Sequence, residues 1–270
     1  MRFSFLLSLR ILLQYLLMVM FQLPQVVNSF LPTQFMNRVM RKLNQSSDSI
    51  NEGKTKNICV VGGGFGGLYA ALKLSRKVDA KTKIYLIDPK DRFVFLPLLY
   101  EIMTGIASAV EVAPLYRDLL GGSKVELLHG KVANIDFTSR TCKLQPASSN
   151  CPNTISYDYL VLAVGNQPRL DLVSGAKEHS MAFYSIDDAF KLRHRLNEIK
   201  RQEKGFIRIS ILGGGYCGVE LATNVAQELG KDRAMVTLIE RNDKILKTSS
   251  EYNRFQAERL VLYVIVRSLS

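Results

Sequence analysis

The sequence predicts an α/β protein built from two three-layer units, with a small antiparallel β meander between their glycine loops. Two observations carry this prediction. A strand, a glycine-rich turn, a helix and a second strand follow one another from Asn57 to Asp88, and the same order returns from Phe206 to Glu240. Short apolar strands separated by a helix are typical of parallel sheets with helices packed on their faces.

The first glycine-rich turn has the form Gly-x-Gly-x-x-Gly, with its three glycines at Gly62, Gly64 and Gly67. The first glycine permits a tight turn, the second lets the backbone approach a pyrophosphate, and the third lets the helix pack closely on the strand. The N–H groups and the positive dipole end of the helix then hold phosphates. The expected phosphate contacts of a first dinucleotide are Gly62, Gly64, Phe65, Gly66 and Gly67.

An acidic residue closes the second strand of this unit. Asp88 lies 21 residues beyond Gly67, at the end of the apolar run 83–88. That spacing places a carboxylate where it accepts hydrogen bonds from the ribose hydroxyls of an adenosine. Because strand, glycines, helix and acid occur in this order, a glycine-rich surface turn is the weaker interpretation.

The same arrangement returns later in the chain. Gly213, Gly215 and Gly218 have the same spacing and follow the apolar run 206–212. An acid, Glu240, ends the next strand 22 residues after Gly218. The expected contacts of a second dinucleotide are Gly213, Gly215, Tyr216, Gly218 and Glu240.

Two complete dinucleotide loops in one chain resemble the two-dinucleotide flavoprotein superfamily. That resemblance implies two Rossmann-like domains, the first for FAD and the second for NADH or NADPH. Residues 157–168 also resemble the superfamily motif Tyr-Asp-x-Leu-Val-Leu-Ala-x-Gly-x-x-Pro, which adds Ala163 and Gly165 to the expected FAD contacts. Glu240 favours NADH because a carboxylate there repels a 2′-phosphate, whereas the adjacent Arg241 leaves NADPH open.

The segment 92–105 indicates the branch of the superfamily. It has no cysteine, unlike the segments that disulfide reductases and sulfide-quinone reductases use. Its Phe-x-Pro-Leu-Leu-Tyr-x-x-x-x-Gly pattern, followed by Val-Ala-Pro at 112–114, resembles type II NADH dehydrogenases of the plastid branch. The resemblance places Pro97, Leu98 and Tyr100 beside the flavin. The alternative is an ordinary apolar patch between a loop and a helix.

The second loop adds a candidate catalytic residue. Gly218-Val-Glu-Leu-Ala matches the same family, whose glutamate lies near the nicotinamide, the flavin and the quinone. By this resemblance Glu220 tunes the flavin–quinone contact or delivers a proton there. The alternative is a first-turn acid that complements the helix dipole.

The resemblance implies an enzyme that passes electrons from NADH or NADPH through FAD to a membrane quinone. It covers residues 56 to 247, whereas family members continue for another domain. We therefore expect the C-terminal part of the fold to be missing, with an incomplete FAD domain at 54–175 and an incomplete NAD(P)H domain at 176–270. The full-length form would associate peripherally with a membrane, and a homodimer is one expected state. The alternatives are a non-catalytic nucleotide-binding fragment and another FAD/NAD-dependent reductase of the superfamily.

Residues 1–53 are interpreted as a targeting leader. An apolar stretch from Phe3 to Leu23 precedes a basic segment that has no acid until Asp48. An apolar core followed by acid-poor, serine-containing sequence is typical of signal and transit peptides. With the Ser29-Phe30 junction, this resembles the bipartite leader of algae with secondary plastids and implies a chloroplast protein. A mitochondrial presequence or an N-terminal membrane anchor is the alternative.

Composition narrows the function classes. The formal charge is +12, but residues 1–57 hold seven Lys/Arg against two Asp/Glu, which leaves 29 basic and 22 acidic residues for the rest. No nucleic-acid-binding motif is present, so nucleic acid is not an expected partner. The four cysteines form no CxxC pair and the three histidines are scattered, which predicts no metal site.

Overall fold

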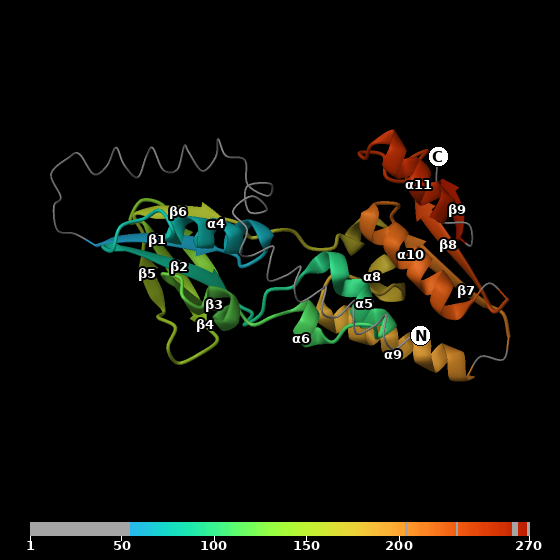
Figure 1. Ribbon diagram of the computed structural model, residues 1–270, viewed down its shortest axis with the longest axis horizontal. Coiled ribbons are helices and arrows are strands. Elements are labelled where there is room, and N and C mark those ends of the chain that lie inside the picture. Colours follow the sequence, from blue (N-terminus) through green and yellow to red (C-terminus); the bar gives the residue numbers. More distant parts are fainter. Residues whose placement is uncertain (1–54, 203–204, 231, 261–263, 269–270) are drawn as a thin grey trace. The chain divides into compact units, whose positions relative to one another are not determined.

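The computed structural model describes residues 55–202, 205–230, 232–260 and 264–268. These residues fall into two compact units. One is formed by residues 55–94 and Ala113–Gln167, and the other by Phe95–Val112 and the described residues after Gln167 (Figure 1). The expected leader, 1–53, lies outside the described residues.

The first unit is built on a six-stranded mixed sheet with the order β5-β4-β3-β2-β1-β6. Strands β3, β2, β1 and β6 are parallel neighbours, whereas β4 and β5 continue from β3 as an antiparallel meander. The bounds are β1 (Lys56–Val61), β2 (Thr82–Asp88), β3 (Val125–Asp136), β4 (Thr141–Pro146), β5 (Thr154–Ser156) and β6 (Tyr159–Leu162).

Both faces of the central strands in this unit are covered. Helix α4 (Phe65–Ser75) packs against β1, β2 and β3. Cys59 and Val61 of β1 belong to a buried cluster that includes Cys142 and Leu144 of the meander. Because alternate residues of a strand point to opposite faces, Ile58 and Val60 lie on the other side of the sheet. Burial on both faces explains why β1 is a continuous apolar run.

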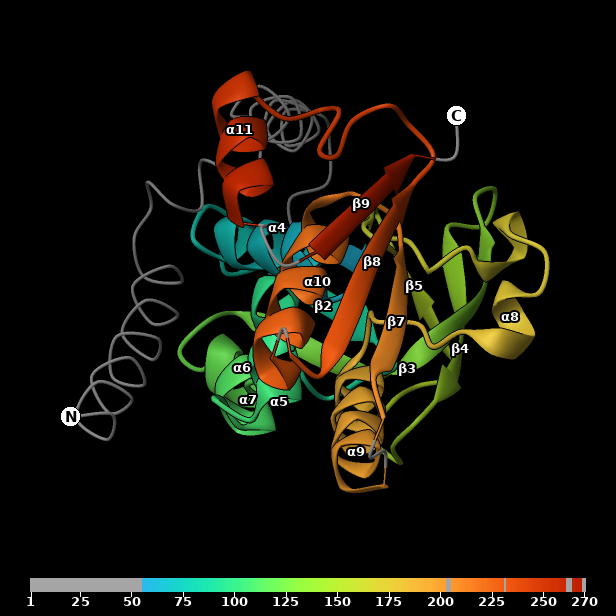
Figure 2. The same cartoon turned by 90° about the vertical axis from the view of Figure 1, so that its right-hand side faces the viewer.

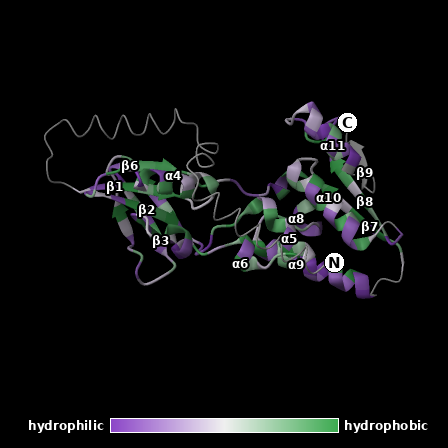
Figure 3. Ribbon diagram, viewed as in Figure 1, coloured by the Kyte–Doolittle hydropathy of each residue, from purple (hydrophilic) through white to green (hydrophobic). Residues whose placement is uncertain are grey.

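The second unit contains a parallel three-stranded sheet with the order β7-β8-β9. Helix α10 (Tyr216–Leu229) packs along it, against β8 above all, and Figure 2 shows the helix beside the three strands. The strands are β7 (Ile207–Leu212), β8 (Ala234–Glu240) and β9 (Val264–Ser268). Figure 3 shows hydrophobic colouring along much of β2, β6, β7 and β8.

The remaining elements of the second unit are helical. Helix α5 packs against α9 and also contacts α10, which is how Phe95–Val112 joins this unit. The domain limits expected at 54–175 and 176–270 stay predictions. The elements are η1 (Leu96–Leu98), α5 (Leu99–Thr104), α6 (Ala109–Val112), η2 (Leu170–Leu172), α8 (Ala176–His179), α9 (Ile186–Gln202) and α11 (Glu251–Leu260), together with α7 (Tyr116–Leu120) in the first unit.

The predicted α/β architecture with its β meander is confirmed, and each glycine loop joins a parallel strand to a helix. Within the described part of the chain, no helix combines the length and apolar character needed to cross a bilayer.

Candidate functional site

The first glycine loop joins β1 to α4, and packing within the protein requires its first and third glycines. Gly62 has a φ of +97°, in the left-handed region that favours glycine. A Cβ on Gly62 would lie 2.3 Å from the carbonyl oxygen of Ala163. A Cβ on Gly67 would lie 1.7 Å from the carbonyl oxygen of Gly62. No side chain fits at either position.

The second glycine of this loop, Gly64, is not required by packing. Its φ of −65° is open to any residue, and a Cβ there would have no atom within 4 Å. Helix α4 begins at this open space without a side-chain cap and without an acid in its first turn. The ring of Phe65 packs edge-on against Phe93, and a Cβ on Gly66 would make only ordinary contact. The helix start therefore faces a space suited to a phosphate group.

Asp88, at the end of β2, is held beside the loop. Its Oδ2 accepts a hydrogen bond from the Gly63 N–H at 2.7 Å, and its Oδ1 accepts one from the Lys90 N–H at 2.8 Å. Each carboxylate oxygen has a further lone pair. The carboxylate is thus fixed in place and still able to accept from a ribose hydroxyl.

The turn after β6 closes against the same loop. Ala163 donates its N–H to the carbonyl oxygen of Val61 at 2.8 Å, and its Cβ lies 3.3 Å from the position of a Cβ on Gly67. Gly165, two residues further along, has a φ of +69°. The structure brings Ala163 together with the first loop, and Gly165 supplies the left-handed residue of the turn that follows.

The second glycine loop, in the second unit, has the same geometry. Gly213 has a φ of +105°, and a Cβ on Gly218 would lie 1.8 Å from the Gly213 carbonyl oxygen. A Cβ on Gly215 would meet nothing within 4 Å. Helix α10 also begins without a side-chain cap or an acid in its first turn. Tyr216 opens this helix, and its hydroxyl lies 2.5 Å from the Ser249 Oγ.

Glu240, at the end of β8, is held more tightly than Asp88. Its Oε2 accepts from the Gly214 N–H at 2.5 Å, and its Oε1 accepts from the N–H and the side-chain amide of Asn242. Burial acts to raise the pKa of Glu240, but the hydrogen bonds from Asn242 and Gly214 together lower it below the ordinary glutamate value. Glu240 is therefore a fixed and ionised carboxylate.

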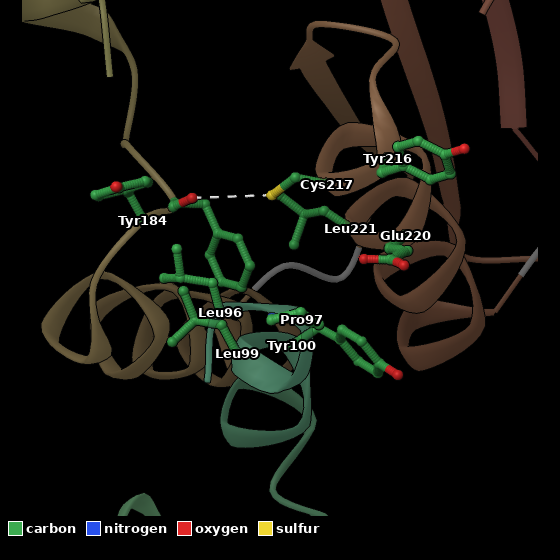
Figure 4. A pocket seen from close by; sticks show the side chains of 10 residues that line it. Leu96, Pro97, Leu99, Tyr100, Tyr184, Tyr216, Cys217, Glu220 and Leu221 are labelled. Atoms are coloured by element: carbon green, nitrogen blue, oxygen red, sulfur yellow. Dashed lines mark hydrogen bonds between the residues drawn. The ribbon is translucent and has the colours of Figure 1, made fainter. Parts of the chain in front are cut away.

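The second unit contains a cavity of about 380 Å³ that gathers several predicted site residues. Figure 4 shows Pro97 and Tyr100 on one side and Tyr216 and Glu220 of α10 on the other. Its size is in the range of ligand pockets and its lining is largely apolar. The lining residues are Leu96, Pro97, Leu99, Tyr100, Phe183, Tyr184, Tyr216, Cys217, Glu220 and Leu221. Leu98 is not among them.

Glu220 is the acidic group of this cavity. Burial raises the pKa of its carboxyl. The pKa of Tyr100 is raised by burial first and then by the carboxylates of Glu101 and Glu220. The pKa of the Cys217 thiol is raised by burial and by Glu220. Glu220 is the fifth residue of α10, so the alternative of a first-turn acid does not apply. A carboxyl in such surroundings is suited to take up and release a proton.

Several residues of these sites were not predicted from the sequence, among them Phe183, Tyr184 and Asn242. Phe183 and Tyr184 enter the cavity from the segment before α9, and no periodicity marks them. Asn242 holds Glu240, and its position two residues after an acid was a usable turn signal. Among the described residues, no cluster of histidine, cysteine or acidic side chains is arranged to hold a metal ion.

The glycine geometry predicts effects of very different size on stability for two alanine substitutions in one loop. Gly67→Ala forces a methyl group onto a backbone oxygen, so we expect it to lower the free energy of unfolding by about 3 kcal/mol or more. Gly64→Ala adds a methyl group in open space, so we expect a change within about 1 kcal/mol. Denaturant unfolding of both variants measures this. Equal destabilisation by the two substitutions would contradict the geometry.

Comparison with known proteins places the chain in a family. The family model described as "Pyridine nucleotide-disulphide oxidoreductase" matches residues 56–261. Demethylphylloquinone reductase NdbB of Synechocystis is 39% identical over 204 residues, covering 74% of this chain and 50% of the relative. The alternative NAD(P)H-ubiquinone oxidoreductase C1, chloroplastic/mitochondrial, of Arabidopsis thaliana is 34% identical, covering 78% of this chain and 43% of the relative.

The fold also matches solved structures. NDH2 from Plasmodium falciparum in complex with NADH superposes with a TM-score of 0.67 at 22% identity, covering 80% of this chain and 48% of that one. The chain spans about half the length of the curated relatives it matches. With its two glycine loops and this match, the chain belongs to the pyridine nucleotide-disulphide oxidoreductase family.

Proposed function

We propose that the protein is a flavin-dependent NAD(P)H:quinone oxidoreductase, which passes electrons from NADH or NADPH through FAD to a membrane quinone. The observation that carries the proposal is the duplication of one site. Each of two uncapped helix starts faces open space at a second glycine, and each has a carboxylate fixed beside it. Two dinucleotides in one chain are what a hydride transfer from nicotinamide to flavin needs.

The residues present fit FAD at the first loop. The free space at Gly64 accommodates a pyrophosphate, and Asp88 is placed to accept from the ribose. FAD would supply a ring that accepts a hydride and passes electrons on to a quinone. The chain would contribute binding and orientation through Gly62, Gly64, Phe65, Gly66, Gly67, Asp88, Ala163 and Gly165.

NADH or NADPH would occupy the second loop, through Gly213, Gly215, Tyr216, Gly218 and Glu240. The fixed carboxylate of Glu240 supports NADH as the donor, because it accepts from a 2′-hydroxyl and repels a 2′-phosphate.

Glu220 would serve the quinone half of the reaction. A quinone takes up two electrons and two protons when it is reduced to the quinol, and a carboxyl with a raised pKa is suited to deliver one of these protons, the second coming from solvent. The apolar lining of its cavity would limit access of water. Contacts of Pro97, Leu98 and Tyr100 with the flavin ring are part of this proposal, although Leu98 does not line the cavity.

The location and assembly of the protein belong to the same proposal. The relatives include a cyanobacterial reductase and a plant enzyme named as chloroplastic/mitochondrial, which supports a plastid protein, with the mitochondrion as the alternative. The full-length form would associate peripherally with the membrane that holds its quinone. A homodimer is the oligomeric state to test first.

A spectrum of the purified protein with FAD tests this function. We expect a bound flavin that loses its absorption when NADH is added under nitrogen and regains it when a soluble quinone follows. Flavin that binds but stays oxidised with both NADH and NADPH would contradict the proposal that one of them is the electron donor. Protein that binds neither nucleotide would contradict the proposed function as a whole. Protein that binds both nucleotides but transfers no electrons between them would be a non-catalytic fragment.

Substitution of Glu220 separates the two half-reactions. Glu220→Gln removes the proton-carrying carboxyl but keeps its size, so we expect reduction of the flavin by NADH to change by less than about twofold. Quinone-dependent turnover should fall by about tenfold or more. The matched control is Glu228→Gln, on the same helix but in an ion pair with Lys200. Equal quinone turnover in the two variants would remove Glu220 from the mechanism.

Substitution of Glu240 tests the choice of electron donor. We expect Glu240→Ala to weaken binding of ADP-ribose by about tenfold, because the hydrogen bonds to the ribose are lost. The same change should improve binding of 2′-phospho-ADP-ribose relative to ADP-ribose, since the repulsion is removed and Arg241 remains. Asp243→Asn, an exposed neutralisation in the same loop, is the control. A preference that is equal in wild type and Glu240→Ala would show that Glu240 does not select the donor.

A further inference from the structure

The middle residue of the first glycine loop is restrained from two sides. The N–H of Gly63 donates to the Asp88 carboxylate at 2.7 Å, and its carbonyl oxygen accepts from the Tyr116 hydroxyl at 2.8 Å. The phenol also lies against the α-carbon, because a Cβ on Gly63 would stand 2.1 Å from the hydroxyl oxygen. Tyr116 thus contacts the phosphate loop, although 53 residues separate it from Gly63.

Tyr116 is itself held firmly. It is 2% exposed, and its backbone N–H donates to the carbonyl oxygen of Asp91 at 2.9 Å. Burial raises the pKa of its phenol, and the nearby carboxylates of Asp88 and Asp91 raise it further. The phenol therefore stays protonated and remains a hydrogen-bond donor at any working pH.

The second loop has the same restraint from an unrelated group. There the carbonyl oxygen of Gly214 accepts from the backbone N–H of Leu246 at 2.8 Å, while the Gly214 N–H donates to Glu240. Leu246 adopts a φ of +49°, a conformation that costs energy for a leucine. Two loops that restrain the same carbonyl by different means indicate that its direction matters to what the loops bind.

Peptide geometry connects this carbonyl to the ligand. The carbonyl of Gly63 and the N–H of Gly64 belong to one planar trans peptide, so they point in opposite directions. A hydrogen bond from Tyr116 to the carbonyl fixes the direction of the Gly64 N–H, at the glycine that faces open space. A hydrogen bond on one side of a peptide also polarises its other side.

We propose that Tyr116 is a positioning residue for the pyrophosphate of the dinucleotide at the first loop: its hydroxyl orients the Gly63–Gly64 peptide so that the Gly64 N–H points at the ligand. This inference rests on the proposed binding of FAD there. The second loop needs no such side chain, because a backbone group does the same task.

The test compares two buried tyrosines of the first unit in the full chain. Tyr116→Phe removes the hydrogen bond to Gly63. Tyr157→Phe is the matched control, because Tyr157 is 8% exposed and its hydroxyl donates to the carbonyl oxygen of Asp136, in the meander. Dissociation constants come from quenching of FAD fluorescence on flavin-free protein. Thermal unfolding without FAD reports stability, and ³¹P NMR reports the pyrophosphate of the bound FAD.

We expect Tyr116→Phe to raise the dissociation constant for FAD by about fivefold to tenfold, the loss of one hydrogen bond, and to shift the ³¹P resonances. Tyr157→Phe should leave both at wild-type values, while the two variants unfold at similar temperatures. Equal FAD affinity in wild type and Tyr116→Phe would overturn the inference alone. A Tyr116→Phe protein that fails to fold would overturn it too, since the hydroxyl would then serve the fold. Wild type that binds no FAD would overturn the proposed function with it.

Discussion

Both units depend on the close approach of a helix to the strand that precedes it. In each loop the third glycine lies so near the first that a Cβ would stand 1.7 Å or 1.8 Å from a backbone oxygen. This approach aims the start of the helix at the carboxyl end of the parallel strands. The next strand ends there as well, which brings Asp88 and Glu240 to their loops. At the second glycine of each loop, Gly64 and Gly215, a Cβ would meet no atom within 4 Å.

The two glutamates of the second unit are placed in opposite environments. Hydrogen bonds lower the pKa of Glu240 and favour its ionised form, whereas burial favours the neutral form of Glu220. A difference of this kind separates a binding role from a proton-transfer role for the same residue type. On the proposed roles, local structure rather than residue type would distinguish the two glutamates.

The two glycine loops could be predicted from the sequence because local geometry determines them. Strand, glycines, helix and acid lie within about thirty residues of each other, and their spacing alone determines the loop. Pro97 and Tyr100 could be joined to Glu220 only through the family resemblance, because the packing of α5 with α10 leaves no periodic pattern. Tyr116, Phe183 and Tyr184 could not be found, since their positions depend on tertiary contacts with distant segments.

Two separate dinucleotide sites in one chain would bind two molecules of ADP, and counting bound ADP tests this most directly. ADP carries the pyrophosphate and ribose that both loops are proposed to hold. Equilibrium dialysis of flavin-free protein should find two ADP per chain in wild type and one in each of Gly64→Ala and Gly215→Ala. Fewer than two ADP in wild type, or two remaining in either variant, would contradict the account.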